Sequence, residues 1–268
     1  VNLQSPNGVG WLNGFDEFVA RCGLENNGSP VFDENGVLQY PLHGRIQNTP
    51  ANKVEVSIDD ATGEITISGT VDEGRLYGNK LRLTTTYMTK PGEPGVRFVD
   101  TVTNLSTQPV GTQLLYHINV GLPLVDPGSK LVAPVSKLAP RSADEWESVE
   151  TWDTYGPETP DAKGVCFFAE LHSDKDGQTR ALLHNSAATQ GVSVLYNTRQ
   201  YPCFTLWKNV QPAADGYVTG LEPATNYPNE RTFEEQQGRV VVLQPGESRA
   251  CQLAIEAHPD AKSIAAAK

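Results

Sequence analysis

Apolar and polar residues alternate along much of this chain. Between residues 54 and 67, apolar side chains recur at every second position on both sides of the turn-like run Asp60–Gly63. The strand-like runs Leu81–Tyr87 and Val96–Thr103 follow, separated by the Pro- and Gly-rich segment Lys90–Gly95. Because these hairpins follow one another without intervening helices, the pattern predicts an antiparallel sheet.

The run Leu114–Gly121 is the most informative of the predicted strands. Its side chains divide into an apolar face and a second face that carries an imidazole beside an amide. The apolar face comprises Leu114, Tyr116, Ile118 and Val120, and the other comprises Leu115, His117 and Asn119. The first face is expected to join the core, and the second has the composition of a polar groove floor.

Strand patterns resume after residue 163. The predicted strands are Val165–Leu171, Ala181–His184, Val192–Tyr196, Cys203–Trp207, Tyr217–Leu221, Val240–Leu243 and Cys251–Glu256. Between Val125 and Lys163 the pattern fades, and we expect a long excursion over the sheet in which Ser142–Glu145 begins a short helix. With no internal repeat and no linker, residues 1–268 are expected to form a single domain.

Two further expectations concern the ends of the chain. The apolar residues Phe15, Phe18, Val19 and Cys22 recur at helical spacing before Gly23, which predicts a short helix. Ser263–Lys268 reads as a frayed tail. The sequence begins at Val1 without a methionine, which favours a missing N-terminal segment.

Composition narrows the classes of partner. The 268 residues carry 21 basic and 32 acidic side chains, a formal charge of −11, and no basic run, which argues against nucleic acid and anionic membranes. No apolar stretch is long enough to span a membrane, and no signal peptide is visible. The four cysteines lie far apart, which favours free thiols in the cytoplasm over a zinc site, with disulfides as the alternative.

Three titratable residues could perform chemistry. His43 stands beside Gly44, a residue that permits close backbone approach, and His117 lies on the polar face described above. Glu222 precedes Pro223, which holds it in an extended conformation at the end of a strand. The alternatives are a solvated loop glutamate and two hydrogen-bonded structural histidines.

The segments Pro41–Arg45, Leu115–Gly121 and Gly220–Pro223 occur in an order that resembles the aldose 1-epimerase (galactose mutarotase-like) superfamily, and within it an aldose-epimerase-like branch. The resemblance spans residues 23 to 256. It implies an all-β fold, an antiparallel β-supersandwich with few short helices, and a site for a small sugar on a concave sheet face.

The resemblance also implies roles for individual residues. His117 would be the general acid, Glu222 the general base and His43 a partner at the ring oxygen of the sugar. Arg45 and Asn119 would contact sugar oxygens. The reaction would interconvert anomers by opening and closing the ring, which requires neither a metal nor an organic cofactor.

Two adjacent residues, Trp207 and Lys208, are further candidates for substrate binding. Trp207 offers an apolar plane for the C–H face of a pyranose, with core packing as the alternative. Lys208 has the opposite parity on an ideal strand, so both cannot face one pocket without a bulge. Inside the site, Lys208 would suit an anionic or oxidised sugar, and outside it Lys208 is a solvated lysine.

Other functions on the same scaffold stay open. A carbohydrate-binding or sensing protein would bind sugar without accelerating anomer exchange. A metal-dependent version would use His43, His117 and Glu222 as ligands, although these residues lack a short local spacing motif. A lyase or another sugar isomerase is a further possibility, because a fold does not fix the reaction.

Overall fold

A computed structural model describes residues 6–15 and 17–268, so Val1 lies outside the described part. The described residues form two compact units. Unit 1 comprises the residues up to Tyr116 together with Ala224–Gln252, and unit 2 comprises His117–Pro223 with Leu253–Lys268. Strands β8 (Val110–Gly121), β15 (Tyr217–Ala224) and β17 (Ser248–His258) contain residues of both units. The single-domain expectation stays a prediction.

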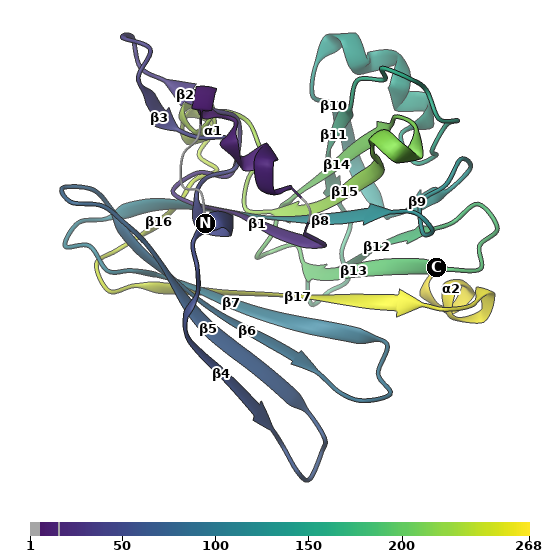
Figure 1. Cartoon of the computed structure of the whole chain (residues 1–268), viewed down its shortest axis with the longest axis horizontal. Helices are drawn as coiled ribbons and strands as arrows, with labels where there is room; N and C mark the ends of the chain where they lie inside the picture. Colours follow the sequence, from purple (N-terminus) through teal and green to yellow (C-terminus); the bar gives the residue numbers. More distant parts are fainter. Residues whose placement is uncertain (1–5, 16) are drawn as a thin grey trace. The chain divides into compact units, whose positions relative to one another are not determined.

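Unit 1 contains the hairpins that the alternation predicted. Four strands pair antiparallel in chain order (Figure 1): β4 (Asn52–Ile58), β5 (Ile65–Gly74), β6 (Lys80–Thr89) and β7 (Gly95–Asn104). The next strand in this sheet after β7 is the first part of β17. The turn before β5 closes where predicted, because the carboxylate of Asp59 accepts hydrogen bonds from the amides of Ala61 and Thr62. The antiparallel prediction is therefore confirmed for this segment.

The predicted helix over Phe15–Cys22 is wrong. Val19–Leu24 is strand β1, which lies beside the first part of β8. Ala20, Cys22 and Leu24 are all buried, so alternate residues face the core as a strand requires, whereas Phe18 is 49% exposed. The apolar residues happen to lie three and four positions apart, as in a helix. The segment forms a strand because its alternate residues pack into the core.

The remaining elements of unit 1 are short. They are the 3-10 helices η1 (Pro6–Gly8), η2 (Gly10–Gly14) and η3 (Ile46–Asn48), the paired strands β2 (Val31–Phe32) and β3 (Leu38–Tyr40), helix α1 (Arg231–Gln236), and strand β16 (Val241–Leu243), which pairs with β8. One apolar cluster of buried residues in this unit includes Leu115 of β8, and its members are Trp11, Ala20, Cys22, Leu115 and Ala224.

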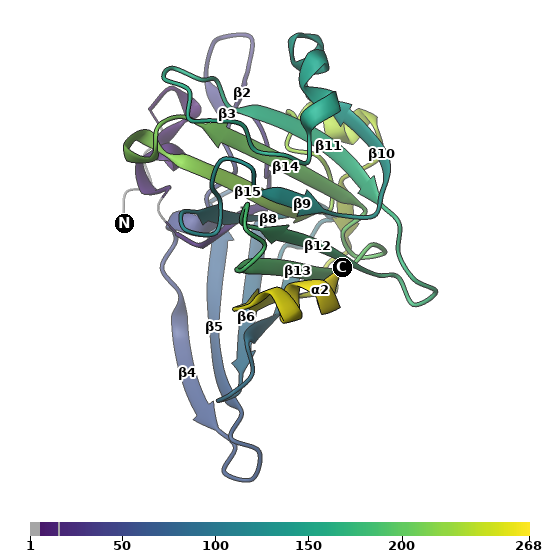
Figure 2. The same ribbon diagram turned by 90° about the vertical axis from the view of Figure 1, so that its right-hand side faces the viewer.

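Unit 2 contains two sheets. In the first, the part of β8 from His117 onward is followed by β15, β14 (Cys203–Val210), β11 (Val165–Leu171) and β10 (Val135–Pro140), and the last four strands lie side by side in Figure 2. In the second, the end of β17 pairs with β13 (Gly191–Asn197), then β12 (Gln178–His184), then β9 (Lys130–Val132). Phe204 of β14 stacks on Tyr196 of β13 with ring centroids 6.2 Å apart, within the core of this unit.

Three further segments of unit 2 bear on the predictions. The 3-10 helix η4 (Ala143–Thr151) follows Ser142, close to the expected helix start, while β9 and β10 lie in the stretch where no strand was predicted. The 3-10 helix η5 (Ala213–Asp215) precedes β15. The expected frayed tail is wrong: Ala261–Ala267 is helix α2, begun by a reciprocal capping box between Asp260 and Ser263, and its Ile264 is buried.

Candidate functional site

His117 and Glu222 meet on one face of the first sheet of unit 2. His117 comes from β8 and Glu222 from the neighbouring strand β15. Nε2 of His117 lies 3.1 Å from Oε1 of Glu222, and the two side chains are only 6% and 2% exposed. Strand alternation explains the placement, since the neighbours of His117 at positions 116 and 118 are fully buried on the opposite face.

Asn119 determines which nitrogen of His117 carries a proton. Its Oδ1 lies 2.6 Å from Nδ1 of His117, two residues away on the same face of β8. An amide oxygen can only accept a hydrogen bond, so in this arrangement Nδ1 is protonated and donates to it. Nε2, which faces Glu222, is therefore the nitrogen that gains or loses a proton.

Glu222 is a buried carboxyl group with an altered acidity. Burial raises the pKa of Glu222 well above its ordinary value, because the ionised form loses solvation. Among the described residues, none directs a hydrogen bond at its Oε1, so the 3.1 Å approach of Nε2 is a close contact off the line of a hydrogen bond. A carboxylate held in this way binds a proton more tightly than one in water.

Gly220 and Trp207 complete the surroundings of the pair. A Cβ atom at Gly220 would lie 2.5 Å from Oε1 of Glu222 and 2.7 Å from Cε1 of His117, so only glycine allows both groups to approach here. The half-buried ring of Trp207, on β14, lies edge-on to the imidazole of His117 with centroids 5.8 Å apart. The structure thus brings together His117, Asn119, Trp207 and Glu222.

Lys208 lies on the other side of β14. The register between β11 and β14 is regular, with Cys166 opposite Trp207 and Val165 opposite Lys208, so the two residues point to opposite faces. The Nζ of Lys208 donates to the carbonyl oxygens of Thr151, Trp152 and Thr154 at 2.8–3.1 Å.

Three acceptors match the three N–H groups of this ammonium, and the rings of Tyr155 and Phe167 lie near it. Burial lowers the pKa of Lys208 to about 8. The structure therefore does not bring Lys208 to the face that carries His117, and its contacts are those of a buried residue that holds the end of η4.

His43 belongs to unit 1 and has an unusual backbone. It adopts a φ of 56°, and a Cβ atom on the following Gly44, at φ 79°, would overlap the carbonyl oxygen of Gly23. Nδ1 of His43 lies 2.8 Å from the carbonyl oxygen of Asn27, which can only accept, so Nδ1 carries a proton. Burial lowers the pKa of His43 to about 4, so at neutral pH the ring is uncharged and Nε2 is an acceptor.

Arg45, also in unit 1, has an acidic neighbour. Its Nη1 lies 3.7 Å from Oε2 of Glu25, whose other oxygen lies 3.8 Å from Nη2 of Arg75. The side chain of Arg45 is 35% exposed and that of Glu25 only 7%. The described contacts of Arg45 are thus those of a charged network within unit 1.

The structure adds residues to this face that the sequence did not single out. Cys166 of β11 lies opposite Trp207, and the amide of Arg141, just past β10, donates to the carbonyl oxygen of Cys166 at 2.9 Å. Burial raises the pKa of the Cys166 thiol to about 12, and the charge of Glu222 acts in the same direction. The strand Val165–Leu171 was predicted, but only the register of the sheet shows that Cys166 and Arg141 share a row with Trp207.

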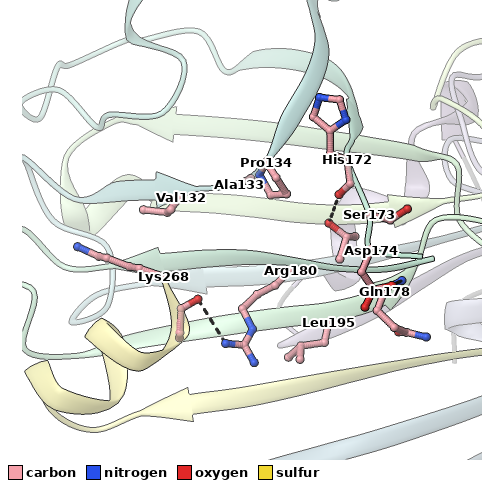
Figure 3. Close-up of a pocket in the computed structure, with 12 residues that line it drawn as sticks. Val132, Ala133, Pro134, His172, Ser173, Asp174, Gln178, Arg180, Leu195 and Lys268 are labelled. Carbon is pink, nitrogen blue, oxygen red and sulfur yellow. Dashed lines mark hydrogen bonds between the residues drawn. The ribbon is translucent and has the colours of Figure 1, made fainter. Parts of the chain in front are cut away.

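The described residues contain cavities away from these side chains. One in unit 2, of about 720 Å³, is lined by residues of β9, β12 and α2, including Arg180, whose guanidinium group donates to the carbonyl oxygen of Ala267 (Figure 3). Another in unit 1, of about 260 Å³, includes Arg21 and Tyr87. None of the residues predicted for the site lines either of them.

Residues 6–15 and 17–268 also bear on metal binding and on membrane insertion. No group of three or more His, Cys, Asp and Glu side chains in these ranges is arranged to hold a metal ion. No helix in the same ranges is long and apolar enough to cross a membrane. All four cysteines are buried free thiols.

Comparison with solved structures supports the fold. A structure described as a "putative aldose 1-epimerase" from Klebsiella pneumoniae is 39% identical, with a TM-score of 0.95, and the match covers 100% of this chain and 69% of that one. A galactose mutarotase-like protein from Clostridium acetobutylicum (15% identity, TM-score 0.63) matches over 88% of this chain and 78% of its own. Galactose 1-epimerase from Lactobacillus acidophilus (13% identity, TM-score 0.58) matches over 96% and 84%.

The predicted resemblance is confirmed: the chain has the mostly β fold of galactose mutarotase-like proteins, with large antiparallel sheets and few short helices. Within that fold class, it belongs to the family described as Domain of unknown function (DUF4432), whose model matches residues 1–257. Comparison with curated proteins finds no match.

Proposed function

We propose that this protein is an aldose 1-epimerase-like isomerase that interconverts the anomers of a small sugar. The observation that carries the proposal is the contact between His117 and Glu222, a buried imidazole and a buried carboxyl group 3.1 Å apart. The two oxygens that exchange protons in mutarotation, the anomeric hydroxyl and the ring oxygen, are bonded to the same carbon. An acid and a base side by side therefore match the reacting group.

The proposed reaction conserves the protons of the pair. With His117 protonated on Nε2 and Glu222 ionised, the carboxylate of Glu222 takes the proton of the anomeric hydroxyl, and His117 gives its Nε2 proton to the ring oxygen. The C1–O5 bond breaks and an aldehyde forms at C1. After rotation about the C1–C2 bond, neutral His117 removes the proton from the C5 hydroxyl and protonated Glu222 returns a proton to the carbonyl oxygen as the ring closes.

The remaining residues have supporting roles in this proposal. Asn119 holds Nδ1 of His117 and so orients the ring, and Trp207 offers an apolar surface to the sugar. For His43 and Arg45, sugar contact stays a prediction of the resemblance. Lys208 is left out, because its ammonium group donates to three carbonyl oxygens elsewhere. The buried free thiols support a location in the cytoplasm.

The test is magnetisation transfer between α and β anomers by NMR across a panel of neutral aldoses, with and without protein. For at least one sugar the exchange rate should exceed the spontaneous rate and fall toward it in Glu222→Gln. Saturable binding of the sugars without any faster exchange would instead identify a carbohydrate-binding protein.

A further inference from the structure

A row of side chains leads from the His117–Glu222 pair to a second polar pair. In the antiparallel sheet of unit 2, Trp207 lies opposite Cys166, and Cys166 accepts the backbone hydrogen bond of Arg141. Residues opposite each other in such a ladder point to the same face, so Arg141, Cys166 and Trp207 share the face on which His117 lies. Strands about 4.8 Å apart put the Cα of Arg141 roughly 10 Å from that of Trp207.

The far end of this row is an arginine next to a glutamate. Nη2 of Arg141 lies 3.8 Å from Oε1 of Glu145, in the first turn of η4, which is too far for a hydrogen bond. Within the described ranges, Oε2 of Glu145 accepts no hydrogen bond, although that oxygen is buried. The Arg141 side chain is 50% exposed and that of Glu145 only 12%.

The two polar pairs flank the same residue. The charges of Glu222, Arg141 and Glu145 all act on the thiol of Cys166, which is 8% exposed and lies between Trp207 and Arg141 in the row. A ligand whose reactive end contacts His117 and Glu222 and whose apolar face rests on Trp207 would therefore present its other end toward Arg141 and Glu145.

The chemistry of the second pair suits hydroxyl groups better than an anion. A hydroxyl both accepts and donates, so two neighbouring hydroxyls can accept from the guanidinium group and donate to the carboxylate at once. The pair has no net charge, and a carboxylate, phosphate or sulfonate on the sugar would be repelled by Glu145 as it approached Arg141. We infer that Arg141 and Glu145 bind neighbouring hydroxyls at the end of the sugar away from C1, so that the protein selects neutral aldoses over acidic or phosphorylated ones.

This inference rests on the proposed function for the orientation of the sugar, so its test separates binding from reaction. A methyl glycoside of the preferred aldose has no anomeric hydroxyl and cannot open its ring. Its dissociation constant, measured by titration calorimetry, should rise about tenfold in Arg141→Ala and in Glu145→Gln. For the free aldose, KM should rise similarly in both variants while kcat stays within about threefold.

A second ion pair on the same two strands supplies the control. Lys137 of β10 and Glu170 of β11 lie 3.0 Å apart and are more exposed than the proposed pair. Lys137→Ala and Glu170→Gln should leave the dissociation constant and KM unchanged. The specificity readout is the ratio of kcat/KM for the aldose to that for its uronic acid, which should fall at least tenfold in Glu145→Gln, since Arg141 then meets an anion without its acidic neighbour.

The outcomes are distinct for the two proposals. Weaker glycoside binding in both variants, without faster anomer exchange in the wild type, would retain the hydroxyl subsite and overturn the catalytic proposal. Unchanged glycoside binding and KM in both variants would overturn the subsite while the catalytic proposal stands. A wild-type preference for a uronic acid or a sugar phosphate over the neutral aldose would also overturn the inference.

Discussion

The proposed chemistry depends, at the scale of single residues, on His117 and Glu222 acting together as one acid and one base. Asn119 keeps a proton on Nδ1 of the imidazole, so the proton that moves lies either on Nε2 or on the carboxyl group. Each position leaves one acid and one base next to each other, ready for ring opening or ring closure.

The buried carboxyl group should make stability depend on pH. Because the pKa of Glu222 is raised in the folded protein, its contribution favours folding below the unfolded-state pKa and is lost as pH rises through the folded-state pKa. Glu222→Gln should therefore raise the melting temperature at pH 8, by about 2–4 °C for each kcal/mol regained. Thermal unfolding followed by circular dichroism from pH 4.5 to 8 measures this.

The difference between wild type and Glu222→Gln should shrink as pH falls toward 4.5, where the wild-type carboxyl group is itself protonated. Glu170→Gln, a substitution of an exposed glutamate in the same sheet, is the control and should show no comparable trend. A constant difference at all pH values would contradict a raised pKa at Glu222.

Asn119 is expected to act as a positioning residue. Asn119→Ala removes the acceptor at Nδ1, so the ring can adopt the other tautomer, and kcat should fall on the order of 10-fold with little change in KM. Asn119→Asp restores an acceptor and adds a negative charge, which favours the imidazolium form. It should recover part of kcat and move the alkaline limb of the pH–rate profile upward, whereas a rise in KM alone would indicate direct sugar binding.

Short motifs in the sequence singled out some of the candidate residues, and the roles given to them stay predictions. His117 and Glu222 were singled out from short segments around each, and the structure brings them into contact. Arg141 and Glu145 gave no such signal, because their relation to Trp207 depends on the register of three strands far apart in sequence. The opposite parity of Trp207 and Lys208 was visible in the sequence, and the regular register of β14 confirms it.

At the scale of elements, the pair requires that β8 and β15 approach closely at Gly220. Gly220→Ala would place a methyl group against both Oε1 of Glu222 and Cε1 of His117, so we expect a loss of about 1–3 kcal/mol of stability together with most of the activity. Urea unfolding and anomer-exchange assays measure the two effects. Gly156→Ala is the matched control in unit 2, because a Cβ atom there meets nothing within 4 Å. Equal behaviour of the two variants would count against the close packing.

Element types followed the hydrophobic pattern where alternation was long. The strand predicted over Leu114–Gly121 is confirmed, since four buried apolar residues recur at every second position, although β8 begins four residues earlier at Val110. The pattern failed at Val19–Leu24, where a run of six residues was too short to separate a strand from a helix. It also missed helix α2, whose start depends on the local capping box at Asp260.

For the molecule as a whole, the proposed reaction uses only side chains of the chain itself. Acid–base ring opening needs no Lewis acid, so prolonged dialysis against a chelator should leave anomer exchange unchanged and readdition of Mg²⁺, Mn²⁺ or Zn²⁺ should not raise it. Elemental analysis of the dialysed protein provides the control. Loss of activity on chelation with recovery on one metal would favour the metal-dependent alternative.

The most direct test of the account is a double-mutant cycle on the anomer-exchange rate, with His117→Asn, Glu222→Gln and the double variant compared with wild type at neutral pH. If the two side chains act as one acid–base unit, each single substitution should lower the catalysed rate by about 10²–10⁴-fold and the double substitution should add little more. A wild-type level of exchange in either single variant, or independent multiplicative losses in the double variant, would contradict it.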